Sequence, residues 1–175
     1  MGLLPKPIWK EEYNYYSKKS VNDLRSDIQH LFDKTNGWDF SVNLTGAFTS
    51  DFGFQMTPKW QFTHIRNFES EIAYLNGRIF QDELKRTRVK FTVRPNSIFA
   101  IFFFAFPLFG LFGLTINNVN GDKNEALIVG LVFTFMAPIV MLMFGYFAKK
   151  GIKDRFVKTF NLEQVEVNLL SADRT

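Results

Sequence analysis

A run of twenty uncharged residues, 97–116, contains seven phenylalanines and constrains the fold more than any other feature of the chain. As a helix, this run would reach about 30 Å, which is the thickness of bilayer hydrocarbon. A second uncharged run covers residues 126–147, and a soluble domain of 175 residues would rarely need two helices that are apolar on every side. The pattern predicts a two-helix transmembrane hairpin, with residues 117–125 as an external loop.

Lysine and arginine are abundant outside the hairpin, and cations near the ends of spans stay on the cytoplasmic side of a membrane. The connecting loop carries Lys123 alone, beside Asp122 and Glu125. We therefore expect an integral protein of the cytoplasmic (inner or plasma) membrane with both termini in the cytoplasm. The same cations also fit recognition of anionic lipid headgroups. They are Lys85, Arg86, Arg88, Lys90 and Arg94 before the first span, and Lys149, Lys150, Lys153, Arg155 and Lys158 after the second.

The two spans hold no Asp, Glu, Lys, Arg or His, although ion paths and transport sites in lipid depend on such residues. Pro107 and Pro138 predict helix kinks. Small residues allow helices to approach closely, and they fit either packing within the hairpin or association with another copy or a larger complex. The small positions are Gly110, Gly113, Gly130 and Thr134.

Outside the spans, the periodicity predicts one helix followed by a β-meander. Ser20 opens an amphipathic helix whose apolar positions are Val21, Leu24, Ile28, Leu31 and Phe32. Alternating apolar residues predict strands over 40–45, 52–56, 60–63 and 89–94. Turns are expected at 49–53, at 81–87 and at Asn76-Gly77, where a strand that passes through with a bulge is the alternative.

Beyond the second span, Ile152, Phe156 and Phe160 are spaced as in a juxtamembrane helix, and residues 165–170 alternate like a strand. Pairing of this last strand with the meander would make the hairpin an insertion in one sheet domain. The predicted class is an α+β membrane protein, with an N-terminal amphipathic helix and a small cytoplasmic antiparallel β domain that is a meander or a partly closed barrel. The predicted segments are 1–19, an aromatic and basic stretch; 20–96, the helix and meander; 97–116 and 126–147, the spans; 117–125, the loop; and 148–175, the juxtamembrane helix and final strand.

The sequence contains few residue patterns that are typical of catalysis or of metal binding. Cysteine is absent, and no nucleophile with a base, metal cluster or phosphate-binding loop has diagnostic spacing. Glu69 and Glu71 would share one face of a strand, which suits a cation or simply a solvated surface. A net charge of +4 is too mild to demand nucleic acid. We therefore expect no catalysis, no cofactor, no metal and no nucleic acid.

Two functional hypotheses follow. In the first, the hairpin anchors a sheet domain that binds a protein partner or self-associates, with Trp9, Tyr13, Tyr15 and Tyr16 as contacts unless they pack on their own domain. In the second, the sheet closes into a ligand-sensing barrel, with a nucleotide as one possible ligand, and the chain oligomerises to act on the membrane. The candidate ligand or partner contacts are Trp60, His64, Arg66, Arg78 and Arg88. The identity of any small-molecule ligand is left open.

Overall fold

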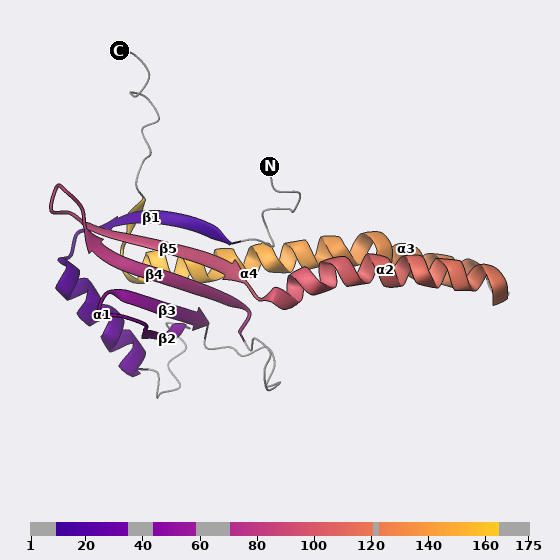
Figure 1. Ribbon diagram of the computed structural model, residues 1–175, viewed down its shortest axis with the longest axis horizontal. Helices are drawn as coiled ribbons and strands as arrows, with labels where there is room; N and C mark the ends of the chain where they lie inside the picture. The colour runs from indigo at the N-terminus through magenta and orange to yellow at the C-terminus, as the bar shows by residue number, and fades with distance from the viewer. Residues whose placement is uncertain (1–9, 35–43, 59–70, 121–122, 165–175) are drawn as a thin grey trace, which may run out of the picture.

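The computed structural model describes residues 10–34, 44–58, 71–120 and 123–164, and shows a sheet domain at one end of a long helical hairpin (Figure 1). The six described strands form an open antiparallel sheet in the order β2-β3-β4-β5-β1-β6. This confirms the predicted α+β class with a sheet that is open. The strands are β1 (Glu11–Ser17), β2 (Leu44–Phe48), β3 (Gly53–Pro58), β4 (Ala73–Gln81), β5 (Thr87–Pro95) and β6 (Glu163–Gln164), and the helical segments are α1 (Val21–Asp33), α2 (Ser97–Asn120), α3 (Lys123–Leu131), the π-helical η3 (Val132–Met136) and α4 (Ala137–Thr159).

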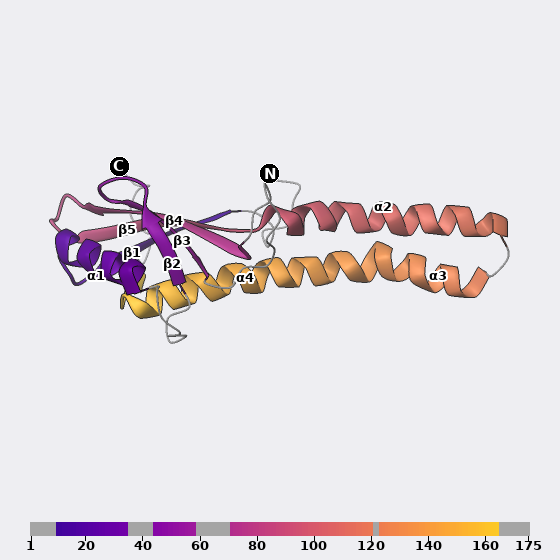
Figure 2. The ribbon, with the colours of Figure 1, turned by 90° about the horizontal axis from the view of Figure 1, so that it is seen from below.

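Helix α1 and the C-terminal half of α4 cover the same face of the sheet (Figure 2). Alternate residues of each strand point toward them, and the buried core is rich in phenylalanine. Phe156 of α4 lies at its centre, with its ring centroid 5.5 Å from that of Phe54, 5.1 Å from Phe91 and 5.2 Å from Phe160. The end of the hairpin is thus part of the sheet domain's core.

Helix α1 begins where the sequence predicts. The Ser20 hydroxyl caps it by accepting a hydrogen bond from the Asp23 amide at 3.1 Å. Leu24, Ile28 and Phe32 are buried against the sheet, and the other two predicted apolar positions pack at its margin. The predicted amphipathic helix is therefore confirmed.

The predicted turn at Asn76-Gly77 is wrong, because β4 runs straight through both residues. Its register with β5 is continuous from Ala73↔Pro95 to Gln81↔Thr87, so there is no bulge either. The glycine has a packing role, since a Cβ on Gly77 would stand 2.3 Å from the Phe54 ring. The turns at 49–53 and 81–87 are confirmed as the β2–β3 and β4–β5 connections.

Strand β1 was not predicted, because residues 11–17 were placed in a separate N-terminal segment. It pairs along its whole length with β5 and turns Tyr15 into the core. Strand β6, which lies just before the predicted last strand, pairs with β1 at Tyr15 and Tyr16. Most of the strand predicted at 40–45, and all of those predicted at 60–63 and 165–170, lie outside the described residues.

The hairpin differs from the prediction at both ends. Helix α2 extends to Asn120 and α3 begins at Lys123, so most of the predicted loop is helical. Segments α3, η3 and α4 follow one another without a break, and the predicted juxtamembrane helix is simply the end of α4. The π segment lies directly before Pro138, which has no amide hydrogen to donate to the Thr134 carbonyl. The Ala137 amide donates to the Val132 carbonyl, five residues earlier, as in a π-helix.

Both connections between hairpin and sheet are held by specific hydrogen bonds. At the start of α2, the Asn96 side chain accepts from the Ile98 amide at 2.8 Å and donates to the Glu71 carbonyl at 2.8 Å. At the end of α4, Asn161 adopts a left-handed φ of 49°, and the Leu162 amide donates to the Val157 carbonyl at 3.0 Å, as in a Schellman motif. The sheet domain is thereby fixed to both legs of the hairpin.

Candidate functional site

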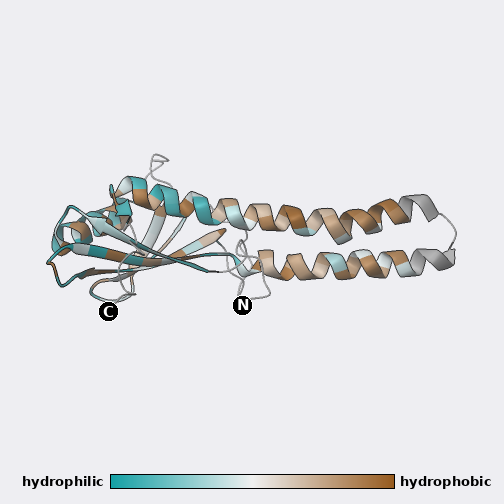
Figure 3. Ribbon diagram, turned by 90° about the horizontal axis from the view of Figure 1, so that it is seen from above, coloured by the Kyte–Doolittle hydropathy of each residue, from teal (hydrophilic) through white to brown (hydrophobic). Residues whose placement is uncertain are grey.

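The outer surface of the hairpin is apolar along most of its length (Figure 3). Two segments, Ser97–Thr115 and Leu127–Thr159, are long and apolar enough to cross a membrane, and only 11% of each candidate window is buried. Leu108 and Phe109 are 68% and 67% exposed. Buried core helices would hide such side chains, and monomeric soluble proteins rarely expose apolar patches of this size.

Close packing between the two legs uses three of the four predicted small residues. A Cβ on Gly110 would lie 2.3 Å from Thr134 Oγ1, and one on Gly130 would lie 2.5 Å from Leu114. Thr134 donates its hydroxyl to the Gly130 carbonyl at 2.7 Å. Gly113 differs, because a Cβ there would meet nothing within 4 Å. The contacts of Gly110, Gly130 and Thr134 thus match packing within the hairpin.

An ion pair between a buried lysine and a partly exposed glutamate joins the sheet to the hairpin where the apolar part of α4 ends. Lys149 is 3% exposed, and its Nζ lies 2.5 Å from Glu11 Oε1 on β1. The Tyr13 hydroxyl donates to the same carboxylate, and the Lys153 ammonium lies 5.2 Å from the centroid of the Tyr13 ring. Sequence analysis missed this pairing because its partners are 138 positions apart.

The ionisation of this cluster follows from its contacts. Burial of the Glu11 carboxyl opposes its ionisation, but the hydrogen bonds from Lys149 and Tyr13 and the charges of Lys149 and Lys153 outweigh it and lower the pKa of Glu11. Burial and the hydrogen bond to Glu11 raise the pKa of Tyr13. These contacts therefore favour the carboxylate form of Glu11 between β1 and α4.

The cations predicted to flank the first span are distributed along β5 and the turn before it. At about 3.3 Å per residue, Arg86 lies roughly 26 Å from Arg94, away from the hairpin. Lys85 lies in the same distant turn, with a left-handed φ of 58°. The cations predicted after the second span lie on the part of α4 that packs against the sheet, where Lys150, Arg155 and Lys158 are exposed.

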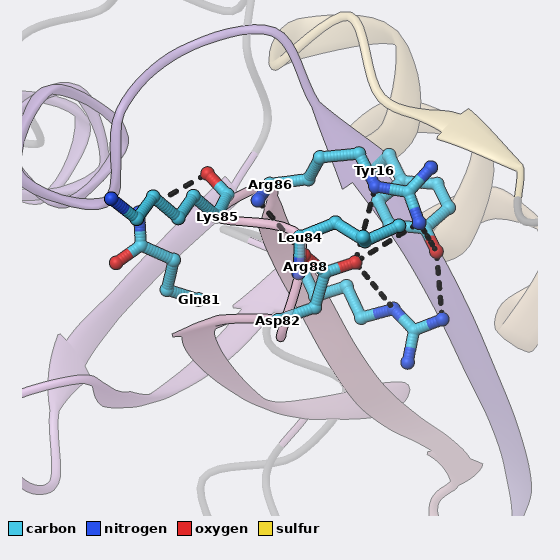
Figure 4. A network of polar contacts seen from close by, with 7 residues as sticks. All are labelled: Tyr16, Gln81, Asp82, Leu84, Lys85, Arg86 and Arg88. Carbon is cyan, nitrogen blue, oxygen red and sulfur yellow. Dashed lines mark hydrogen bonds and ion pairs between the residues drawn. The ribbon is translucent and has the colours of Figure 1, made fainter.

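Arg86 and Arg88 converge on Tyr16 at the far end of the sheet (Figure 4). Both donate to its hydroxyl, at 2.9 and 2.7 Å, and their guanidinium carbons lie 4.3 and 5.0 Å from the ring centroid. Asp82 closes the β4–β5 turn by accepting the amides of Leu84 and Arg86 at 3.0 and 2.8 Å. Burial opposes ionisation of Asp82, but these donors and the charge of Arg86 lower its pKa.

An open cavity of about 580 Å³ lies beside this network. Its lining includes Lys18, Lys19, Lys85 and Arg86, together with Glu163. Some of this charge is already paired, since Lys18 lies 2.7 Å from Glu163 and Lys19 lies 2.5 Å from Asp27. The cavity is therefore basic, although less so than its cations alone suggest.

The sheet face opposite α1 and α4 carries no described helix, and most of its side chains are polar or charged, with Tyr16, Tyr74 and Phe80 as its aromatic residues. Arg78 of β4 stands directly across from Lys90 of β5. Lys90 also lies 2.5 Å from Glu12 of β1, whereas no described acidic side chain pairs with Arg78. We call the surface formed by Arg78, Lys90, Asn76, Thr92 and Asn14 the open face.

Of the predicted ligand contacts, Trp60, His64 and Arg66 lie outside the described residues, as does Glu69. Arg78 and Arg88 lie on neighbouring strands of the same sheet face. The Glu71 amide donates to the Tyr74 hydroxyl at 3.3 Å, and the described residues contain no group of three acidic, histidine or cysteine side chains that could hold a metal. Tyr13, Tyr15 and Tyr16 pack on their own domain.

None of the known family models, curated proteins or solved structures compared with this chain matches it.

Proposed function

We propose that this chain is a membrane-anchored interaction protein, in which the hairpin crosses the bilayer and holds the sheet domain against the cytoplasmic surface to bind a partner. Its role is binding rather than catalysis. A single observation carries the proposal: one continuous run of helix is apolar and exposed over its first part and buried in the sheet's core at its end.

The dimensions support this placement. Helix α2 is about 36 Å long at 1.5 Å per residue, which is enough for about 30 Å of hydrocarbon. The run from Lys123 to Thr159 is about 55 Å long, so roughly 25 Å remains beyond the hydrocarbon. That remainder corresponds to the length of α4 that packs on the sheet.

The charges support the orientation. Arg94, Lys149, Lys150 and Arg155 all belong to the end of the hairpin that carries the sheet, and the loop end has Lys123. The positive-inside rule then places the sheet domain in the cytoplasm. Strands β1 and β6 belong to the same sheet, so the described chain begins and ends on that side.

Thiol labelling tests both insertion and orientation, because the natural chain has no cysteine. Asn120→Cys at the loop end of α2 and Ser26→Cys on the exposed side of α1 are the matched variants. In intact cells, a membrane-impermeant maleimide should label the first and not the second, which should react only after permeabilisation. Labelling of Ser26→Cys alone would reverse the orientation, and recovery of the chain in the soluble fraction would refute insertion.

A ligand-sensing effector is the second candidate, and the observation in its favour is the basic cavity beside Tyr16. The open sheet offers no barrel interior for a ligand, so sensing would have to use this cavity. A nucleotide at 100 times its Kd would stabilise the fold by about 2.7 kcal/mol. A rise in melting temperature with a nucleotide, together with a change in mass by light scattering, would favour this candidate over the first.

A further inference from the structure

We propose that the open face binds a protein segment that carries carboxylates, with Arg78 and Lys90 at the centre of the site. This inference rests on the proposed function and deepens it, because it names the chemistry of the partner.

The register of the two central strands builds a repulsion into the open face. Arg78 and Lys90 are direct cross-strand partners, and like charges placed opposite each other destabilise a sheet. Arg78 is exposed. Lys90 is already paired with Glu12 at 2.5 Å, so Arg78 is the cation that a docking carboxylate would neutralise, and a guanidinium suits a carboxylate in geometry.

The neighbouring positions supply the other contacts that a peptide needs. Asn76 pairs with Thr92 one row away, and Asn14 pairs with Lys90 on the β1 side. These side chains present amide and hydroxyl groups to a bound backbone. Arg86 and Arg88 are already engaged by Tyr16 and Asp82, and Lys90 by Glu12, so the available positive charge of the open face is that of Arg78.

A lipid surface fits this position poorly. Strand β5 leads into α2, and Lys90 lies four residues before Arg94, or about 13 Å farther from the hairpin. Headgroup regions are only about 5 to 8 Å deep on each side of the hydrocarbon. The strands also extend along the direction of the hairpin, so that the open face is turned sideways to a bilayer (Figure 1).

Single-stranded nucleic acid also fits poorly, because its binding sites use aromatic rings on which bases can stack. The Tyr16 ring is covered by two guanidinium groups. The Tyr74 ring is 8% exposed and has the Arg94 guanidinium carbon 4.4 Å from its centroid, and Phe80, across from Arg88, is half-buried. Carboxylates on a protein segment remain the chemistry that this surface complements.

The test measures the affinity of the full-length chain, in a neutral detergent, for a fluorescein-labelled peptide of eight glutamates by fluorescence anisotropy. The face variant is Arg78→Gln with Lys90→Gln. The matched control is Arg155→Gln with Lys158→Gln, which removes the same charge from exposed positions of α4. We expect the face variant to raise the Kd at least about tenfold and the control to change it less than about threefold.

Melting temperature tests whether the face variant is folded, and this variant should melt within a few degrees of the natural chain, because the Lys90–Glu12 pair that it loses is exposed. Equal loss of affinity in both variants, or no binding of the glutamate peptide, would overturn the proposal. So would tighter binding to phosphatidylserine vesicles or to an oligothymidine, if that binding were lost in the face variant. None of these results changes the cysteine labelling, so a failure here is distinguishable from a failure of the membrane placement.

Discussion

Replacing Phe156 with alanine tests the central structural claim, that the end of α4 is part of the sheet domain's core. The Phe156 side chain is fully buried, and its ring contacts Phe54, Phe91 and Phe160. Removing a buried phenylalanine side chain costs about 3 to 5 kcal/mol, because both its transfer energy and its packing contacts are lost. We expect a loss of this size for Phe156→Ala.

The same helix provides the control. Phe147 lies nine positions earlier and is 57% exposed, so Phe147→Ala leaves no cavity in the core. Substitutions at such exposed positions usually change stability by about 0.5 kcal/mol or less. The comparison therefore changes the same residue type to alanine on one helix and varies only its surroundings.

Thermal unfolding of the sheet domain in mild detergent, followed by circular dichroism, measures both variants. For a domain of this size, 1 kcal/mol corresponds to about 4 to 8 °C, so Phe156→Ala should lower the melting temperature by at least about 12 °C and Phe147→Ala by a few degrees at most. If Phe156→Ala does not fold, Phe156→Leu should show a smaller loss in the same direction. Equal shifts at positions 156 and 147 would refute the claim.

Further predictions concern the junction, the sheet and the hairpin. Lys149→Met should lower the unfolding free energy by about 1 to 2 kcal/mol, because the partly exposed Glu11 carboxylate then loses this partner, whereas Lys150→Met at an exposed position should not; denaturant titration checks both. The folded pKa of Glu11 lies below its ordinary value of 4.5, so its contribution to stability is complete above that value and is lost as the pH falls through the folded pKa. Between pH 6 and 3, the melting temperature of Glu11→Gln should therefore fall less than that of the natural chain. Gly77→Ala should cost about 1 to 3 kcal/mol through its clash with Phe54, which its melting temperature would show. Gly110→Ala should weaken the packing between the two legs of the hairpin and so lower the melting temperature, and Gly113→Ala should not.

Elements with a regular period were predictable from the sequence, because the period itself reports which side is buried. Helix α1 and strand β5 show this, with apolar residues at helical spacing in one and at every second position in the other. The two apolar helices were predictable from length and charge alone. These elements depend on local sequence, so a single chain is enough to find them.

Asn76-Gly77 shows where local reasoning fails. The dipeptide is a strong turn signal, but here the glycine leaves room for the Phe54 ring on the next strand, and the chain continues through it. Strand β1 fails for a related reason, since its glutamates and tyrosines become a strand only by pairing with β5, more than seventy residues later. The Glu11–Lys149 pair is also a long-range contact, and no local sequence pattern predicts it.

The basic residues before the first span illustrate how topology changes the meaning of a charge. In sequence, they stand close to the span and act as a plausible orientation signal. In an extended strand each residue adds about 3.3 Å, whereas in a helix it adds 1.5 Å, so cations on β5 are carried away from the hairpin while those on α4 stay nearer to it. Under the proposed membrane placement, Arg94 and the cations of α4 are therefore the residues that would orient the hairpin. On β5 itself, Lys90 has its opposite charge in Glu12 of β1, whereas Arg78, across from it on β4, is the cation for which we propose a partner that brings the opposite charge.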